Sequence, residues 1–167
     1  MSPLRKARSR PDVNLTSPCL ALLLALAVVP ALPAQREKLP AADLEFVQKT
    51  WPEARKTQTG IRYVILREGA GEFPKPGDKV NVLYVGRLLD GTVFDQATEA
   101  DKPFTFRVRR DMVIEGWEQV LQLMRKGEKR LVIIPPELGY GTRGQPPKIG
   151  RNATLVFEIE LVSFGRD

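Results

Sequence analysis

The chain has 167 residues, 43% of them hydrophobic and 28% charged, which is the composition of one soluble globular domain with room for a tail. It contains no histidine, and its single cysteine, Cys19, lies in a segment that we expect to be removed. Without either residue, a mature protein cannot use Ser-His-Asp or Cys-His mechanisms, disulfides or the usual zinc ligands. We therefore expect no cofactor and no metal. Carboxylate, lysine or tyrosine chemistry remains open, as does chemistry that transfers no proton.

The first 34 residues have the order of a secretory signal peptide. Basic residues in 5–10 precede the apolar run 20–29, and small residues follow it, so that cleavage after Ala31 or Ala34 would fit. The run has about half of the roughly 20 apolar residues that a spanning helix needs. We predict a signal peptide at 1–34 and an exported protein, periplasmic or secreted. The long basic lead keeps an uncleaved membrane anchor as the alternative.

The net charge of +6 raises the hypothesis of a nucleic-acid or anionic-membrane binder. Without residues 1–34 the net charge falls to +3, and acids and bases are interspersed with no basic block. This pattern is typical of a solvated mixed surface. We expect no nucleic-acid partner, and membrane contact only if the signal segment is not cleaved. The binding hypothesis would require an affinity that collapses with added salt.

Residues 35–57 are polar and charged with scattered apolar positions. Leu44, Val47 and Trp51 have the spacing i, i+3 and i+7, which predicts a short amphipathic turn or two before Pro52. We interpret the segment as a linker or short N-terminal extension that docks loosely on the domain. A dimerisation element is the alternative.

From Gly60 onwards, apolar and polar residues alternate as is typical of half-buried strands. In the segment 79–89, Val80, Val82 and Tyr84 share one face. Asp90 and Gly91 then predict a hairpin turn, because both residues tolerate positive φ. We expect the other strands within 61–69, 92–95, 103–108, 130–135 and 153–164.

One helix is predicted over 114–125, because its apolar residues form a single stripe. The stripe consists of Trp117, Val120, Leu121 and Met124. Lys126 and Gly127 are a plausible stop, with a cation and a C-cap glycine at the end of the helix. A single short helix must bury its stripe against a sheet. The fold class is therefore α+β, an antiparallel sheet of about five strands wrapped around one short helix.

Between the last two expected strands lies an 18-residue loop, 135–152, that is rich in glycine and proline. A loop of this length in a small domain is usually functional or disordered. The final strand alternates, with apolar residues on one face and Glu158 and Glu160 on the other. This is the pattern of an antiparallel sheet with one face in water.

Four segments together resemble an FKBP-type peptidyl-prolyl cis-trans isomerase domain, in order and in spacing. They read VNVLYVGRLLDGTVFDQ, KPFTF, VIEGWEQVLQLMRKGEKRLVIIPPELGYG and NATLVFEIELV. The resemblance implies an isomerase domain at 58–167, in an exported, bacterial-like form. It also implies the fold described above, partners that are proline-containing peptides or unfolded and partly folded proteins, and inhibition by macrolides.

The resemblance further implies a proline-binding pocket. Its catalytic residues would be Asp95, Tyr140, Ile114 and Trp117. Its substrate-binding residues would be Tyr84, Phe94, Phe104, Val113, Ile149 and Phe157. In this assignment Trp117 forms the floor, Ile114 offers its backbone N–H, Tyr140 offers its hydroxyl, and Asp95 is the acidic group of the wall.

The long loop departs from the best-known members of the family. Gln145 stands where many have a histidine, and KIGRN replaces a more proline-rich ending, although Ile149 keeps an apolar residue. We therefore leave substrate preference and macrolide affinity open.

Isomerisation suits a chain without histidine, because an Xaa-Pro bond is twisted without any proton transfer. The barrier of about 18–20 kcal/mol comes from amide resonance. An apolar pocket can lower it by desolvating the planar amide, and preorganised donors can lower it by favouring the twisted form. We predict an isomerase that assists folding of exported proteins. The alternative is a protein-binding or chaperone module on the same fold with little isomerase activity.

Overall fold

A computed structural model describes residues 36–166. The predicted signal segment, residues 1–34, and Cys19 lie outside the described residues. Residues 36–166 belong to one compact unit. No helix within 36–166 is long and apolar enough to cross a membrane.

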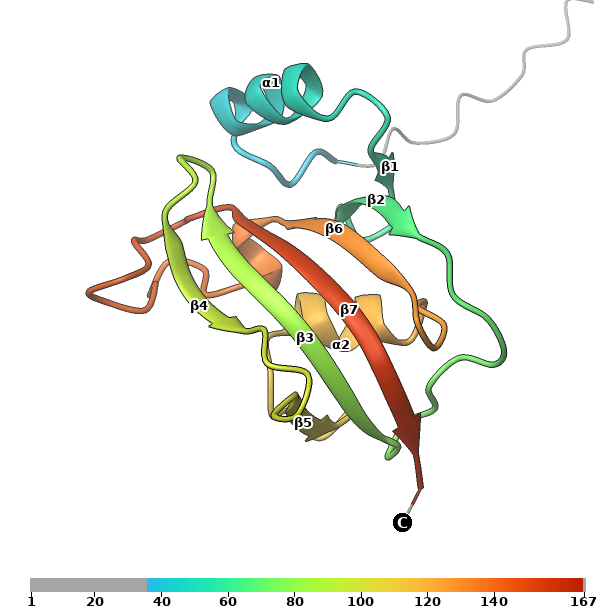
Figure 1. The fold of residues 1–167 in the computed structure, drawn as a ribbon. Helices are drawn as coiled ribbons and strands as arrows, with labels where there is room; N and C mark the ends of the chain where they lie inside the picture. The colour runs from blue at the N-terminus through green and yellow to red at the C-terminus, as the bar shows by residue number, and fades with distance from the viewer. Residues whose placement is uncertain (1–35, 167) are drawn as a thin grey trace, which may run out of the picture. The chain divides into compact units, whose positions relative to one another are not determined.

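The unit is built around one antiparallel sheet (Figure 1), in which β7 is central between β6 and β3. Its order is β1-β2-β6-β7-β3-β4, with β5 paired to the side of β3. The strands are β1 (Arg55–Lys56), β2 (Arg62–Arg67), β3 (Lys79–Leu88), β4 (Val93–Ala97), β5 (Phe104–Arg107), β6 (Lys129–Ile134) and β7 (Leu155–Gly165). A 3-10 turn, η1 (Pro136–Leu138), follows β6. The expected α+β class is confirmed, with seven strands in the described residues because short ones such as β1 join the sheet.

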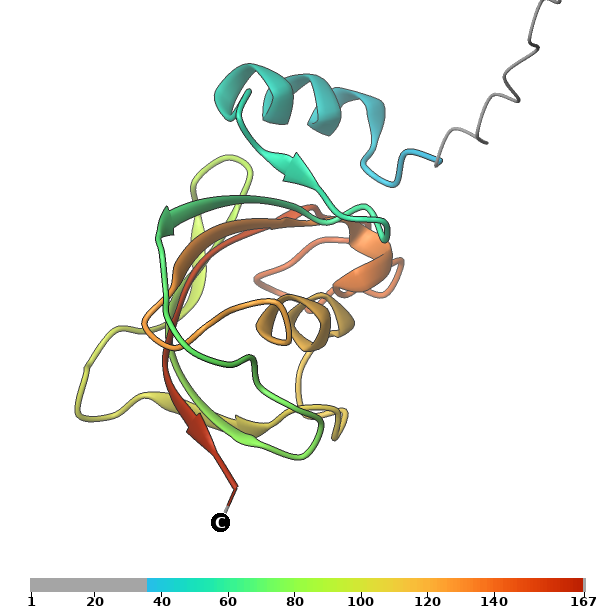
Figure 2. The same ribbon diagram turned by 90° about the vertical axis from the view of Figure 1, so that its right-hand side faces the viewer.

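The sheet curves around the short helix α2 (Glu115–Leu121), as Figure 2 shows. The predicted stripe is buried, since Trp117 is 4% exposed and Met124 is fully buried. The helix ends earlier than expected, at Leu121, because Leu123 N–H and Met124 N–H bond to carbonyls three residues back, at 2.9 and 3.2 Å. Gly116 lets α2 approach the sheet closely, because a Cβ there would lie 2.6 Å from Ile134 Cγ2.

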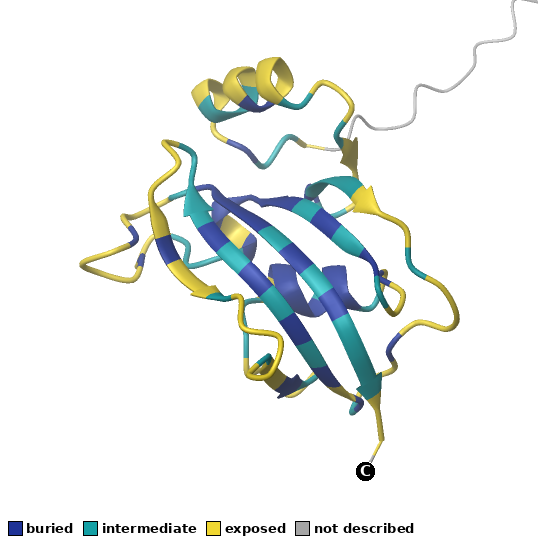
Figure 3. Ribbon diagram, viewed as in Figure 1, coloured by how far each residue is buried: buried dark blue, intermediate teal, exposed yellow. Residues whose placement is uncertain are grey.

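Burial alternates along β3 and β7, as predicted from their patterns (Figure 3). Val82 and Ile159 are fully buried in the same apolar cluster as the stripe of α2. Ion pairs occupy the opposite face, where Glu158 meets Arg87 at 3.1 Å and Lys129 at 3.0 Å. Most of that outer face is therefore polar, as expected.

One end of the outer face is covered by the N-terminal segment and its helix α1 (Ala41–Thr50). Val47 of α1, only 1% exposed, packs with Ile133 of β6 and Val156 of β7. The hydroxyl of Thr154 donates to Asp43 Oδ2 at 2.6 Å. The prediction that this face lies in water was therefore incomplete, because α1 supplies apolar partners for the outward side chains of Ile133 and Val156.

Glu37 fastens the start of the same segment. Its carboxylate accepts hydrogen bonds from Arg62 at 2.8 Å, from Lys56 at 3.0 Å and from two backbone N–H groups. Burial opposes ionisation, but the hydrogen bonds from Leu39 N–H, Lys56 and Lys38 N–H, together with the Arg62 charge, lower the pKa of Glu37 to about 2. The segment is thus held by an ionised carboxylate as well as by apolar packing.

Candidate active site

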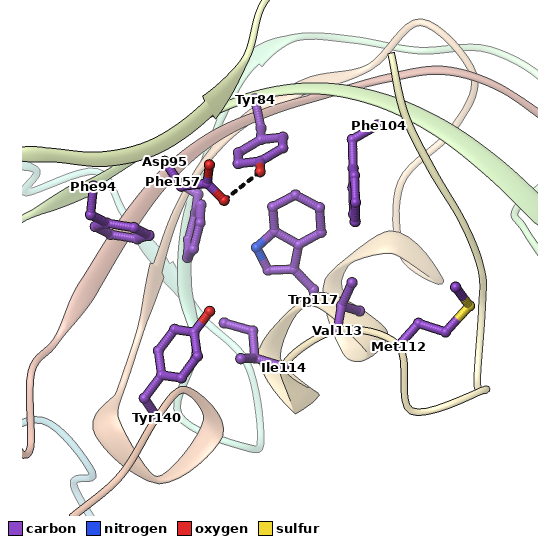
Figure 4. Close-up of a pocket in the computed structure, with 10 residues that line it drawn as sticks. All are labelled: Tyr84, Phe94, Asp95, Phe104, Met112, Val113, Ile114, Trp117, Tyr140 and Phe157. Carbon is purple, nitrogen blue, oxygen red and sulfur yellow. Dashed lines mark hydrogen bonds between the residues drawn. The ribbon is translucent and has the colours of Figure 1, made fainter. Parts of the chain in front are cut away.

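A pocket opens between the concave face of the sheet and the N-terminal end of α2 (Figure 4), with a volume of about 140 Å³. Its walls come from β3, β4, β5, β7, the segment before α2 and the loop after η1. It is lined by Tyr84, Phe94, Asp95, Phe104, Met112, Val113, Ile114, Trp117, Tyr140 and Phe157.

Trp117 forms the centre of an aromatic cluster at the base of the pocket. Its ring is edge-on to Tyr84, with ring centroids 4.8 Å apart, and to Phe157, 5.3 Å apart. Phe104 approaches from β5 at 6.1 Å. Edge-to-face pairs at these distances are favourable and hold each ring in one orientation. The first turn of α2 thereby presents a rigid apolar floor.

Gly86 of β3 makes room for two of these rings. It lies in register opposite Phe157 on β7 and Asp95 on β4. A Cβ at this position would lie 2.7 Å from Phe157 Cε1 and 2.8 Å from two ring atoms of Phe94. A glycine inside a strand often marks such a close approach. The glycine within the predicted strand 79–89 was thus the available indication of this contact, and it was missed.

The polar edge of the pocket consists of two phenols and one carboxylate. Tyr84 donates its hydroxyl to Asp95 Oδ2 at 2.7 Å, and Asp95 Oδ1 accepts from Gln96 N–H at 3.0 Å. Burial, and then the hydrogen bond and charge of Asp95, raise the pKa of Tyr84 well above its usual range. Burial and the Asp95 charge also raise the pKa of Tyr140. Both phenols therefore stay protonated at neutral pH and serve as donors.

Besides the buried indole N–H of Trp117, two donors of the residues that line the pocket have no partner in the described part of the chain. Ile114 is the N-cap of α2, and its carbonyl accepts from Trp117 N–H at 2.9 Å. Its own N–H precedes the helix and has no acceptor among residues 36–166. The Tyr140 hydroxyl, which points into the cavity in Figure 4, has none there either. A substrate carbonyl could accept from either group.

The structure brings together all the predicted site residues except Ile149. Ile149 is 2% exposed and packs in the core, while its backbone pairs with Gln145 across the loop, at 2.9 and 3.0 Å. Met112, 59% exposed, lines the mouth and was missed. Its position directly before Val113 was the available indication. No group of three or more metal-ligating side chains occurs in the described residues.

Such a site suits an enzyme that changes the conformation of a peptide bond. It combines an apolar floor with neutral donors, and its lining contains no serine, cysteine, lysine or histidine side chain.

Comparison with known proteins identifies the family. Residues 70–162, more than half of the chain, match the family described as FKBP-type peptidyl-prolyl cis-trans isomerase. The peptidyl-prolyl cis-trans isomerase FKBP2 of Mus musculus is 50% identical over 112 residues, which cover 67% of this chain and 79% of the relative. The FK506-binding protein 1 of Dictyostelium discoideum is 42% identical over 105 residues, or 63% and 98% of the two chains. The chain belongs to the FKBP-type peptidyl-prolyl cis-trans isomerase family and is a peptidyl-prolyl isomerase.

Solved structures agree on the fold. A crystal structure of a peptidyl-prolyl cis-trans isomerase from Pseudomonas syringae pv. tomato superimposes with a TM-score of 0.66 at 38% identity. The match covers 75% of this chain and 92% of the bacterial one. The similar proteins come from an animal, an amoeba and a bacterium, so the family match extends across very different organisms.

Proposed function

We propose that this isomerase acts on Xaa-Pro bonds of exported proteins and that the aromatic pocket on Trp117 is its active site. The observation that carries the proposal is the pairing of an apolar aromatic floor with two unpartnered donors, Ile114 N–H and the Tyr140 hydroxyl. The floor accepts a proline ring by apolar contact, and the donors hold the flanking carbonyls. No proton has to move.

The pocket has two means of lowering the barrier. The planar amide is the more polar form, so transfer from water to the aromatic floor penalises it more than the twisted form. The donors at Ile114 and Tyr140 are fixed before the substrate arrives, so they favour the twisted geometry without reorganisation. Each tenfold increase in rate requires an activation free energy lower by about 1.4 kcal/mol. If the two sources together lower the rotation barrier of about 18–20 kcal/mol by a few kcal/mol, the rate rises enough for a useful catalyst.

Asp95 acts in this scheme through its charge and its hydrogen bond to Tyr84. The 2.7 Å bond fixes the Tyr84 ring against Trp117, and thus one wall of the pocket. The exposed carboxylate also sets a negative potential at the mouth. We assign Asp95 to orientation and electrostatics, because its two oxygens already accept hydrogen bonds from Tyr84 and Gln96.

Export is supported by the sequence of residues 1–34, which have the basic, apolar and small-residue order of a signal peptide. The substrates are then proline-containing segments of unfolded or partly folded proteins outside the cytoplasm, in the periplasm or the medium. The Dictyostelium relative is named for binding FK506. We propose that macrolides of that type also enter this pocket, since its apolar floor and its donors could hold a ring-containing ligand in the same way as proline.

The test is NMR exchange of an Xaa-Pro peptide with residues 35–167 and three variants, Trp117→Ala, Asp95→Ala and Tyr140→Phe. Acceleration by the wild type that each folded variant weakens supports the site. Tyr63→Phe is the matched control, because Tyr63 lies under Arg130, 4.6 Å from its guanidinium carbon, and not in the pocket. A folded wild-type protein that does not accelerate exchange would overturn the proposal and leave a binding module.

A further inference from the structure

A second hollow lies beside the proline pocket and shares Phe94 and Asp95 with it. Its other walls belong to the loop after η1, through Gln145, Pro146, Pro147 and Lys148. We call it the loop hollow. Because the two cavities have a common wall, a peptide with its proline on Trp117 places neighbouring residues over the loop hollow.

Lys148 is the charged residue that the loop contributes to this hollow. Its Nζ donates to the Phe94 carbonyl at 2.9 Å, which ties the loop to β4. A carbonyl accepts the hydrogen bond but leaves the charge of the ammonium uncompensated, and two of its three donors stay available. Lys148 is exposed, and no carboxylate lies within 4 Å of it among the described residues. Asp95, the acid of the same hollow, accepts hydrogen bonds from the neutral donors Tyr84 and Gln96, keeps its charge, and makes no ion pair with Lys148.

The rest of the loop strengthens the positive charge on this side of the site. Between Glu137 and Glu158 the chain contains Arg143, Lys148 and Arg151 and no acidic residue. Glu137 itself pairs with Lys38, at 3.3 Å.

Two cations of the segment between β4 and α2 are paired with nearby carboxylates. Lys102 meets Glu99 at 3.0 Å, and Arg109 meets Glu115 at 3.1 Å. The hollow therefore holds one charge of each sign, Asp95 on the β4 side and Lys148 on the loop side, and the ammonium of Lys148 is the cation that a substrate carboxylate would meet there.

We infer that Lys148 determines specificity: the site prefers Xaa-Pro segments with an acidic side chain next to the proline. The inference rests on the proposed function of the pocket. A carboxylate of the substrate would fill the free donor positions of Lys148 within the loop hollow. Exposed ion pairs of this kind change an equilibrium by about twofold to fivefold, and salt screens them. A basic side chain at the same position is disfavoured by a similar factor.

The experiment compares kcat/KM by NMR exchange for peptides with Glu, Gln or Lys directly before or directly after proline. For the wild type at low salt, we expect Glu to exceed Gln by about twofold to fivefold in at least one of the two positions. The Glu/Gln ratio should fall to about one in Lys148→Gln and in about 0.5 M salt, and should persist in Lys148→Arg. Ratios within one protein cancel any general loss of activity from a disturbed loop.

Lys126→Gln is the matched control. It removes the same charge, but Lys126 follows the C-terminal end of α2, whereas Ile114 and Trp117 lie at the N-terminal end. A Glu/Gln ratio of one in the wild type overturns the inference, as does a ratio that persists in Lys148→Gln. If no peptide is isomerised, the proposed function fails separately. In that case, NMR shift titration gives the affinities of the same peptides, and the ratio of the Glu to the Gln affinity in the wild type and in Lys148→Gln tests the role of Lys148.

Discussion

Gly86→Ala should destabilise the protein and damage its active site together. The added Cβ would lie 2.7 Å from Phe157 Cε1 and 2.8 Å from Phe94 Cε2 and Cζ. Carbon atoms in good contact are about 3.5–4.0 Å apart, so the two rings must retreat by about 0.7 Å or more. They have little space, because Phe94 is 6% and Phe157 4% exposed and their ring centroids are 5.5 Å apart.

Overpacking of this kind costs about 1–3 kcal/mol of unfolding free energy. Phe157 also lies edge-on to Trp117, so its displacement distorts the pocket floor. We expect kcat/KM to fall by about tenfold to a hundredfold, the usual effect of a misplacement near 1 Å.

Urea unfolding and NMR exchange measure the two effects. Gly165→Ala is the control, because a Cβ there meets nothing within 4 Å and the backbone is not left-handed. The control should stay within about 0.5 kcal/mol of the wild type. If Gly86→Ala matches the wild type in both stability and rate, the close approach of β3 to the two rings does not constrain the site.

Three further predictions concern the segments around the pocket. Glu37→Gln should make the free energy of unfolding less dependent on pH in acid. The reason is that an ionised Glu37 stabilises the fold above its ordinary pKa of 4.5 and loses this effect as pH falls towards about 2. Urea unfolding at several pH values in this range measures the dependence, and the same dependence in the wild type and the variant would contradict the prediction. The raised pKa of Tyr84 should keep its phenol protonated beyond pH 10 in the folded protein, so the free energy of unfolding should fall above pH 10, where the unfolded phenol ionises. Ultraviolet titration should show a lower pKa for Tyr84 in Asp95→Asn. An unchanged titration curve would refute the effect of Asp95 on Tyr84. Val47→Asp should detach α1 at a cost of about 1–3 kcal/mol of unfolding free energy, while isomerase activity stays within about twofold. Hydrogen exchange of the α1 amides measures the detachment. Phe46→Asp is the control and should leave α1 in place, because Phe46 is already 44% exposed.

The parts of the fold that follow from one-sided burial could be predicted from the sequence. The alternation in β3 and the stripe of α2 each require one apolar face, and the structure buries those faces against each other. The apolar run of β6 was harder to interpret. Val132 and Ile134 face the core, while Ile133 faces α1, so burial on both faces removes the alternation. That run was itself an indication that something covers the outer face.

The candidate pocket depended on the family resemblance more than on any residue pattern. On a helix stripe, Trp117 by itself is indistinguishable from ordinary core. The rings that meet at Gly86 and the exposure of Met112 depend on how separate strands and loops come together, and no local pattern contains that information. Ile149 illustrates the reverse case, because the family resemblance implied a ligand contact, whereas its side chain is 2% exposed and packs in the core.

The position of β7 has a consequence for the order in which the chain can fold. Among the described strands, synthesis reaches β7 last, yet β7 pairs with both β6 and β3 in the middle of the sheet. Val156 of β7 and Thr154, which lies directly before β7, also complete the outer surface on which α1 rests. Helix α1, which is made before every described strand, therefore docks after β7 has joined the sheet, and a nascent chain that stops before residue 155 lacks the strand between β6 and β3. We expect such a polypeptide to stay unfolded until residues 155–165 have been made, so that folding of this domain follows synthesis of the whole described sheet rather than accompanying it.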